Sequence, residues 1–320
     1  MDGLKRIVKL ATLALAAVMV LQAFPTAASA ACPATNPVSA LIAAIDAANA
    51  DSKSNQHAIN LFPQTTYVLS TDCVLPTITS KIHINGNGAT IDGAGVVQVF
   101  NVAVNGDLRL NVLKVSGGSA FPGGGIYNAG ALTVNDVIIS GNNGGGIFNA
   151  GGTLILKDST VSGNQAEDGA GIETFGGTLT LNHTSVVGNF AGREGGGIRS
   201  ENAIVTLDNR SIVSFNTGGH GAIFITGGML TLNDHSSVDH NTCGGQGGGI
   251  FNNGTVILND HSGVNENTAI ATFQGGGIYN LGTVTLNDHS SITGNFPQDV
   301  FNQGGTLTVN GAARVGTVAP

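Results

Sequence analysis

The chain has 320 residues, with 49 glycines, no tryptophan and only 10% charged residues, but 41% of it is hydrophobic. That apolar share excludes a disordered polypeptide. The net charge of −8 disfavours nucleic acid and anionic membranes as partners, because both are bound through basic patches, whereas neutral glycans or cations are compatible with it.

Residues 1–30 have the three parts of a secretory signal peptide. Lys5, Arg6 and Lys9 are basic, residues 10–21 are apolar, and residues 28–30 are small enough for cleavage. The apolar run is too short for a good membrane span. We therefore expect an exported mature chain without a transmembrane segment, located outside the cell or on the surface of a bacterial envelope.

Residues 31–80 are predicted to form an N-terminal cap with the first strands. Cys32 and Cys73 bracket this segment and are candidates for a disulfide, which would contribute on the order of 3–4 kcal/mol. After Asn36-Pro37, apolar residues at helical spacing predict a short amphipathic helix over about 37–48. Cys243 is left over and is expected to be a small buried or turn thiol, since no histidine-bearing motif marks it as a nucleophile.

From about 123 to 310 the sequence repeats a unit of 20 to 30 residues, which is the signature of a solenoid. Three aliphatic columns run through the units, and apolar residues alternate with polar ones as in strands with one buried face. The first column is Ile126, Ile147, Ile172, Ile198, Ile223, Ile250 and Ile278; the second is a pair such as Leu154/Leu156 and Leu179/Leu181; the third is Ile139, Val161, Val186, Val213, Val238, Val264 and Ile292.

Short strands of this kind bury their apolar faces only by coiling and stacking on one another. Successive coils then place parallel strands about 4.8 Å apart, with right-handed crossovers. We predict an all-β fold, a right-handed parallel β-helix of about ten coils over 81–320, with the helix covering its N-terminal end. No second helix follows the strand near Leu307, so the final residues or a partner would cover the other end, and end-to-end self-association is one way to do so.

The repeated elements resemble the GGAI and FxxN motifs of polymorphic outer membrane protein repeats. They occur here as Gly-Gly-Gly-Ile at 123–126 and 275–278, and as aliphatic-x-x-Asn at 139–142 and 292–295. The phenylalanine of FxxN is Val or Ile in every coil of this chain. The resemblance spans nearly the whole mature chain and implies the fold and a surface location much more than an activity.

One asparagine per unit occupies the same bend. Stacked in successive coils, these residues are predicted to form a structural ladder of amide hydrogen bonds and to tolerate unusual backbone angles. The ladder comprises Asn142, Asn164, Asn189, Asn216, Asn241, Asn267 and Asn295.

An Asn-Asp-His sequence recurs in one slot of three units and supplies the ligand or cation candidates. They are Asp234, His235, Asp260, His261, Asp288 and His289. Stacked carboxylates about 5 Å apart could share a cation such as calcium, and stacked histidines could bind a transition metal. The alternative, favoured because duplication spreads turn sequences, is that Asn-Asp begins a turn and the histidine faces water. No cofactor is predicted and no metal site is assigned.

A polysaccharide lyase or glycoside hydrolase on this fold would need two or three carboxylates that converge on one face. Charged residues are dense enough only in the least regular stretch, at Glu167, Asp168, Glu173, Arg193, Glu194, Arg199 and Glu201. Their alternation favours solvated loop charges, so no catalytic residue is assigned. His220 resembles part of a polygalacturonase motif, but the partner motifs are missing and we interpret it as a repeat variant.

The sequence therefore leaves two functions. The first is a non-catalytic exported protein that acts as an adhesin or as a glycan-binding or structural envelope component, with a polysaccharide or a host or envelope surface as its partner. The second is a polysaccharide lyase or glycoside hydrolase. Uniform coils favour the first, because enzymes usually interrupt such a pattern with long loops, although the few aromatic residues weaken the case for sugar binding.

Overall fold

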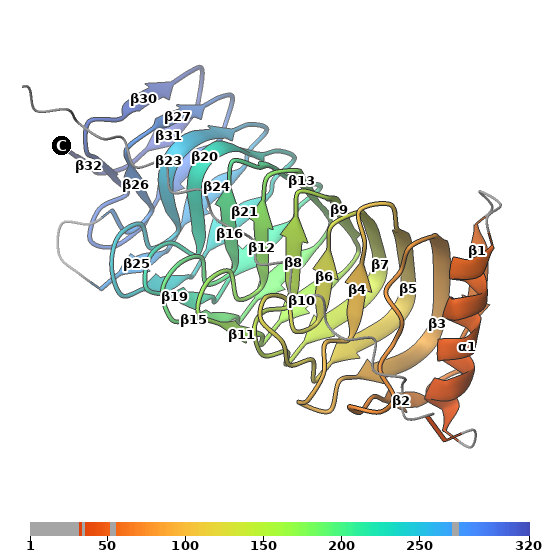
Figure 1. The fold of residues 1–320 in the computed structure, drawn as a ribbon. Helices are drawn as coiled ribbons and strands as arrows, with labels where there is room; N and C mark the ends of the chain where they lie inside the picture. Colours follow the sequence, from red (N-terminus) through yellow and green to blue (C-terminus); the bar gives the residue numbers. More distant parts are fainter. Residues whose placement is uncertain (1–31, 34–35, 52–55, 271–274) are drawn as a thin grey trace, which may run out of the picture.

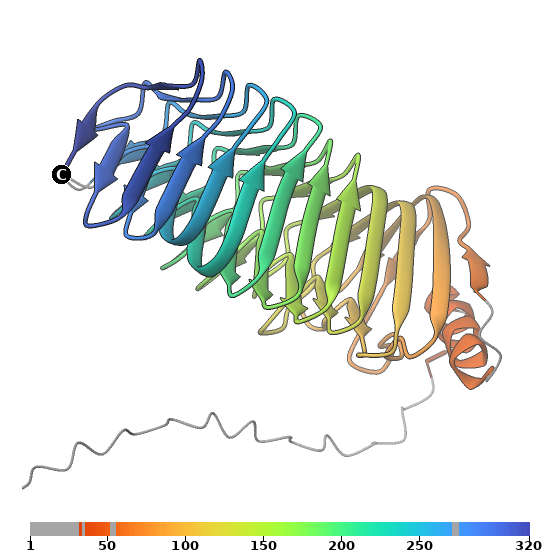
Figure 2. The same ribbon diagram turned by 90° about the horizontal axis from the view of Figure 1, so that it is seen from above.

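The computed structural model describes residues 32–33, 36–51, 56–270 and 275–320, and the predicted signal peptide lies outside them. These residues form an all-β parallel solenoid of about ten coils, with one helix near the N-terminal end (Figures 1 and 2). The predicted fold class is confirmed. Among the described residues, no helix is long and apolar enough to cross a membrane.

Each coil contributes strands to three faces, which we call A, B and C in chain order. Face A contains β4 (Phe100–Val102), β6 (Ile126–Asn128), β8 (Ile147–Ala150), β12 (Ile172–Phe175), β16 (Ile198–Glu201), β26 (Ile278–Asn280), β29 (Val300–Asn302) and β32 (Val318–Ala319). Face B contains β1 (His57–Asn60), β9 (Thr153–Lys157), β13 (Thr178–Asn182), β17 (Ile204–Asp208), β27 (Thr283–Leu286) and β30 (Thr306–Val309). Face C contains β2 (Thr66–Val68), β10 (Thr160–Ser162), β14 (Ser185–Val187), β18 (Ile212–Ser214), β21 (Ser237–Asp239), β24 (Gly263–Asn265), β28 (Ser291–Thr293) and β31 (Arg314–Val315).

Some strands run through two faces without a break. Faces A and B are joined in β20 (Ile223–Leu232) and β23 (Ile250–Leu258), and faces B and C in β3 (Lys81–Asp92), β5 (Asp107–Ser116) and β7 (Ala131–Ser140). A smaller five-stranded sheet follows face C and consists of β11 (Gln165–Ala166), β15 (Phe190–Ala191), β19 (Thr217–Gly218), β22 (Thr242–Cys243) and β25 (Thr268–Ala269).

The three predicted aliphatic columns stack in register and form the core. On face A, Ile172 pairs in parallel with Ile147 and Ile198, and on face C, Val186 pairs with Val161 and Val213. All six side chains are fully buried. Stacking therefore gives each coil the apolar partner that it lacks alone.

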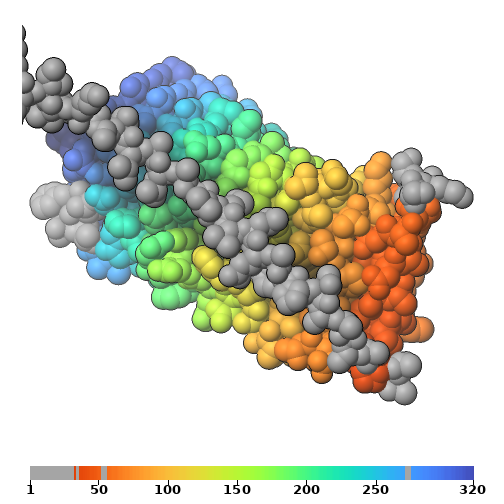
Figure 3. All heavy atoms as spheres, viewed as in Figure 1, coloured from red at the N-terminus to blue at the C-terminus, as the bar shows by residue number. Residues whose placement is uncertain are grey.

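Helix α1 (Pro37–Ala50) covers the N-terminal end of this core (Figure 3). The side chain of Asn36 accepts a hydrogen bond from the backbone N–H of Val38, which caps the first turn. Val38 and Ile45 are fully buried on the inner face of the helix. A disulfide joins Cys32 to Cys73 and ties the segment before the helix to the first coil.

The opposite end of the described chain is more open. None of residues 301–320 is buried. Strands β31 and β32 extend the ladders by pairing with β28 and β29, and they do not fold across the end of the core.

Candidate functional site

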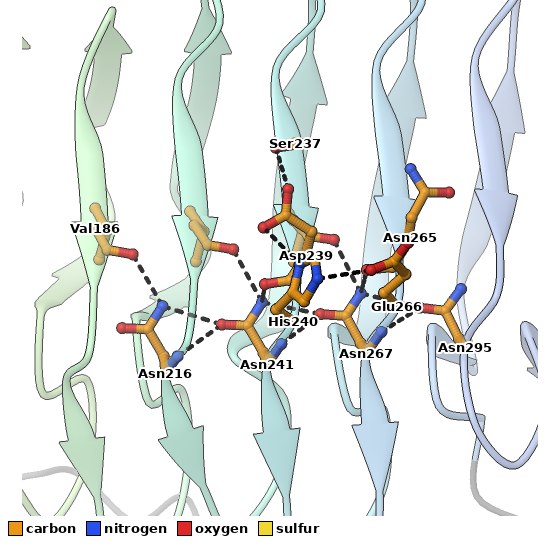
Figure 4. A network of polar contacts seen from close by, with 12 residues as sticks. Val186, Asn216, Ser237, Asp239, His240, Asn241, Asn265, Glu266, Asn267 and Asn295 are labelled. Atoms are coloured by element: carbon orange, nitrogen blue, oxygen red, sulfur yellow. Dashed lines mark hydrogen bonds and ion pairs between the residues drawn. The ribbon is translucent and has the colours of Figure 1, made fainter.

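The buried asparagine ladder is a closed hydrogen-bond system. Figure 4 shows part of it, in which Asn216 donates from Nδ2 to Oδ1 of Asn241 at 3.1 Å and to the carbonyl of Val186 at 2.9 Å. Its own Oδ1 accepts from the backbone N–H and Nδ2 of Asn189, at 3.0 and 2.9 Å. The same pattern links successive members of the ladder, so these amides have no free group for a ligand.

The unusual backbone angle at this bend belongs to the residue before each ladder asparagine, and not to the asparagine as we expected. In four coils that residue is a glycine with positive φ, namely Gly141, Gly163, Gly188 and Gly294. In the three coils between Gly188 and Gly294 it is Phe215 (φ 54°), His240 (φ 53°) and Glu266 (φ 56°). Bulky side chains rarely adopt this left-handed conformation, because Cβ approaches the following carbonyl oxygen.

These three residues form a surface cluster that the sequence analysis missed. The rings of Phe215 and His240 stack with centroids 5.3 Å apart. The Nε2 atom of His240 lies 2.6 Å from Oε2 of Glu266, and its Nδ1 lies 3.5 Å from Oδ1 of Asp239 (Figure 4). Phe215 is 62% exposed. The signal in the sequence is that a repeat position otherwise held by glycine changes type in three consecutive coils.

The Asn-Asp-His slot forms the corner between faces B and C. Each asparagine donates across the coils, from Asn287 to Asn259 at 2.8 Å and from Asn259 to Asn233 at 2.9 Å. The aspartates that follow adopt left-handed φ values of 49° to 54° and, like the histidines, are exposed. This geometry is that of a turn in which the histidine faces water.

The three histidines of this corner stack in parallel. Ring centroids are 4.9 Å apart between His235 and His261 and 4.7 Å apart between His261 and His289, with planes 4° apart. Imidazole lone pairs lie in the ring plane, so parallel rings do not direct them at one ion. Nowhere in the described ranges do three or more His, Cys, Asp or Glu side chains form a group that could hold a metal ion.

A change in turn length opens a groove at this same corner. The last buried residue of face B and the buried residue of face C are five positions apart in one coil, at Leu181 and Val186. In the next coil they are six positions apart, at Leu207 and Val213. The extra residue gives two consecutive left-handed residues, Asn209 and Arg210.

The groove at this step, here called the corner groove, has two adjoining parts. A volume of about 350 Å³ is lined by His183, Asn209, Arg210, Asp234 and His235. A second volume of about 310 Å³ is lined by Asp158, Ser159, Thr160, His183, Ser185, Arg210 and Ile212. Both parts share His183 and Arg210, and both lie along the B–C edge of face C.

Some polar side chains of the groove bind each other, and one has no partner among the described residues. Nδ1 of His183 lies 2.7 Å from Oδ1 of Asp158, so these two side chains bind each other. Arg109, Arg193 and Arg199 all contact carboxylates, whereas the guanidinium of Arg210 forms no ion pair or hydrogen bond with any residue that the structure describes. Its donors are therefore available to a ligand.

The seven charged residues of the least regular stretch come together on face A and in the turns that precede β12 and β16. Arg199 contacts Glu173 and Glu194 at 3.0 Å each and Glu201 at 3.3 Å. Arg193 pairs with Asp168 and lies 3.6 Å from Glu167. Glu173 and Asp168 are only 7% and 8% exposed, so the interpretation as solvated loop charges is wrong for these two residues.

Register explains why Glu173 is buried. Glu173 and Arg199 occupy the outward slot that Phe148 holds in the preceding coil and Phe224 in the following one. The guanidinium of Arg199 also lies 4.8 Å from the ring centroid of Phe175. Burial raises the pKa of Glu173 from 4.5 to about 7, while attraction to Arg199 opposes the shift.

The aromatic residues of this column cover one another. Centroid distances are 5.5 Å from Tyr127 to Phe148, 4.5 Å from Phe224 to Phe251 and 5.3 Å from Phe251 to Tyr279, with planes within 22° of parallel. Rings stacked along the solenoid axis present edges to the solvent. The column thus stabilises face A and offers little ring surface to a sugar.

No protein-family model matches the chain, and no curated protein or solved structure matches it either. The fold therefore defines the class, a parallel β-solenoid, and the resemblance to polymorphic outer membrane protein repeats rests on the motif residues alone.

Proposed function

We propose that the mature protein is an exported, non-catalytic β-solenoid that binds polysaccharide at the cell surface or in the extracellular space, as an adhesin or envelope component. The observation that carries this proposal is the corner groove, where donors and acceptors face open space in an otherwise regular solenoid. Sugar hydroxyls both donate and accept hydrogen bonds, so such a lining suits them.

The ion pairs of the face-A cluster support a role without catalysis. Each of its five carboxylates contacts Arg193 or Arg199. A glycosidase needs one carboxylate free to act on the sugar or on water and a second carboxyl group to supply a proton. Here, arginine holds every candidate for the free carboxylate.

The test is to incubate the purified mature chain with a panel of soluble polysaccharides, with and without calcium. Binding is followed by retardation of the protein in gels that contain each polymer, and polymer length by size-exclusion chromatography. We expect retardation by at least one polymer, without shortening. Absence of retardation by every polymer would overturn the binding function.

The second candidate is a polysaccharide lyase or glycoside hydrolase, and one observation favours it. Glu173 is a buried carboxyl group whose pKa of about 7 would let it donate a proton at neutral pH. If any polymer is shortened, Glu173→Gln should abolish the shortening. Glu266→Gln, at the end of face C rather than on face A, should not.

A further inference from the structure

We propose that face C between Arg210 and Phe215 binds a neutral saccharide chain; this inference rests on the polysaccharide-binding function proposed above and names its site. The two residues flank β18 (Ile212–Ser214) at opposite edges. The corner groove lies at the Arg210 edge and the exposed ring of Phe215 at the other, within the same coil.

Phe215 offers the aromatic surface that the face-A column lacks. One side of its ring stacks on His240 of the following coil. The matching position of the preceding coil is Gly188, where an added Cβ would meet no atom within 4 Å. The other side of the ring is therefore open, and the C–H face of a sugar ring can pack on it.

The Arg210 edge supplies hydrogen bonds to hydroxyls. Arg210 has uncommitted donors, and the carboxylates of Asp158 and Asp234 and the ring of His183 line the same groove. One arginine faces two aspartates in this groove, so its arginine and carboxylate charges give no positive excess to attract a polyanion. Mixed donors and acceptors without positive charge favour a neutral saccharide.

The surface between the two edges combines polar side chains with the partly exposed Val187 and Ile212 and is of suitable length. Thr160, Ser162 and Ser185 are partly exposed on neighbouring strands of face C. Five residue steps separate Arg210 from Phe215, which is at most roughly 17 Å at 3.3 Å per extended residue, since only Ile212–Ser214 is a strand. A saccharide of several units that runs along the strand can thus reach both edges.

Phe215 also has a left-handed backbone conformation, although the fold does not require a phenylalanine at this bend. Glycine serves the same bend at Gly141, Gly163, Gly188 and Gly294. A phenylalanine at φ 54° is strained, and strained residues cluster at functional sites. Phe215→Gly therefore separates binding from folding, because it restores the residue of the repeat.

The experiment compares wild-type protein with Phe215→Gly and Arg210→Gln by calorimetric titration with neutral oligosaccharides from β-glucan, mannan and xylan, and with oligogalacturonate as the acidic probe. We expect at least a tenfold loss of neutral-saccharide affinity in both variants, with the Tm of Phe215→Gly equal to or above that of wild type. Phe62→Ala, a 70% exposed residue beside the capped end, and Arg314→Gln, in the last coil, are the matched controls and should bind as wild type does.

Three results would overturn the site. Wild-type affinity for a neutral saccharide in both variants would place binding elsewhere and leave the polysaccharide-binding function standing. Binding of oligogalacturonate alone would refute the neutral ligand. If wild type binds no saccharide, the proposed function itself fails. Should Phe215→Gly lower the Tm, Arg210→Gln decides, because its side chain forms no hydrogen bond or ion pair with the described residues.

Discussion

Asn295 donates two hydrogen bonds to a single oxygen of Asp299. Its backbone N–H and its Nδ2 both lie 2.9 Å from Oδ1, and the other carboxylate oxygen accepts from the backbone N–H and hydroxyl of Thr317 at 2.7 and 3.1 Å. Every amide of the ladder donates towards the next coil, so the last one needs a partner that only accepts. An ionised carboxylate is such a partner, and Asp299 therefore terminates the ladder.

Asp299→Asn should loosen the last coils. Both carboxylate oxygens of Asp299 accept hydrogen bonds, and the variant replaces one of them with an NH2 group. That group then faces the donors of either Thr317 or Asn295. We expect the free energy of unfolding to fall by about 1–3 kcal/mol and the amide of Thr317 to exchange faster, as measured by urea denaturation and hydrogen exchange. Asp288→Asn, in an exposed left-handed turn, is the control and should change stability by less than about 0.5 kcal/mol.

Two asparagine ladders in one molecule allow a matched test of burial. Asn216→Ala takes their partner inside the core from the carbonyl of Val186, the backbone N–H of Asn189 and one N–H of its Nδ2, and we expect a loss of about 3 kcal/mol or more. Asn259→Ala, in the half-buried corner ladder, should cost about 1 kcal/mol or less, because water replaces the amide. Equal losses in urea denaturation would contradict this account.

Glu173 should make stability depend on pH. Burial raises its pKa from 4.5 to about 7, so the folded protein holds this proton more tightly than the unfolded chain. The resulting stabilisation is complete below pH 4.5 and is lost as the pH rises to about 7. Glu173→Gln should remove that slope and be more stable than wild type at pH 8, by at most about 3 kcal/mol. Thermal unfolding between pH 4 and pH 8 checks this, and an unchanged slope in the variant would refute it.

The thiol of Cys243 should be inert in the folded protein. It is fully buried, and burial raises its pKa to about 12, so almost no thiolate forms at pH 8. Iodoacetamide should label no cysteine in the native protein, one after unfolding in urea, and three after unfolding with reductant, as counted by mass spectrometry. Labelling of the native protein would show that the buried position is wrong.

The core could be predicted from the sequence because three aliphatic columns repeat in every unit, and the capping helix because Asn36-Pro37 precedes residues at helical spacing. The environment of Glu173 could not. Alternation shows that it faces outward, but its burial depends on Arg199 and Phe148 in the adjacent coils, which only the register brings beside it.

The candidate binding surface was missed for a related reason. The Asn-Asp-His repeats were candidates because they are alike in three units. The corner groove instead forms where the units differ, between His183 and Arg210. Phe215 likewise differs from the glycine of its repeat position. Comparison of the units for their exceptions would have found both residues.

The step in turn length also divides the solenoid into two blocks of coils. In the coils from Leu110 to Val186 the aliphatic residues on the two sides of this turn are five positions apart, and in those from Leu207 to Val315 they are six positions apart. Such a division is what two separate bursts of duplication would leave, each copying its own ancestral unit, with a seam between them. Later gain or loss of coils within either block would lengthen or shorten the rod and leave the seam, with its groove, unchanged.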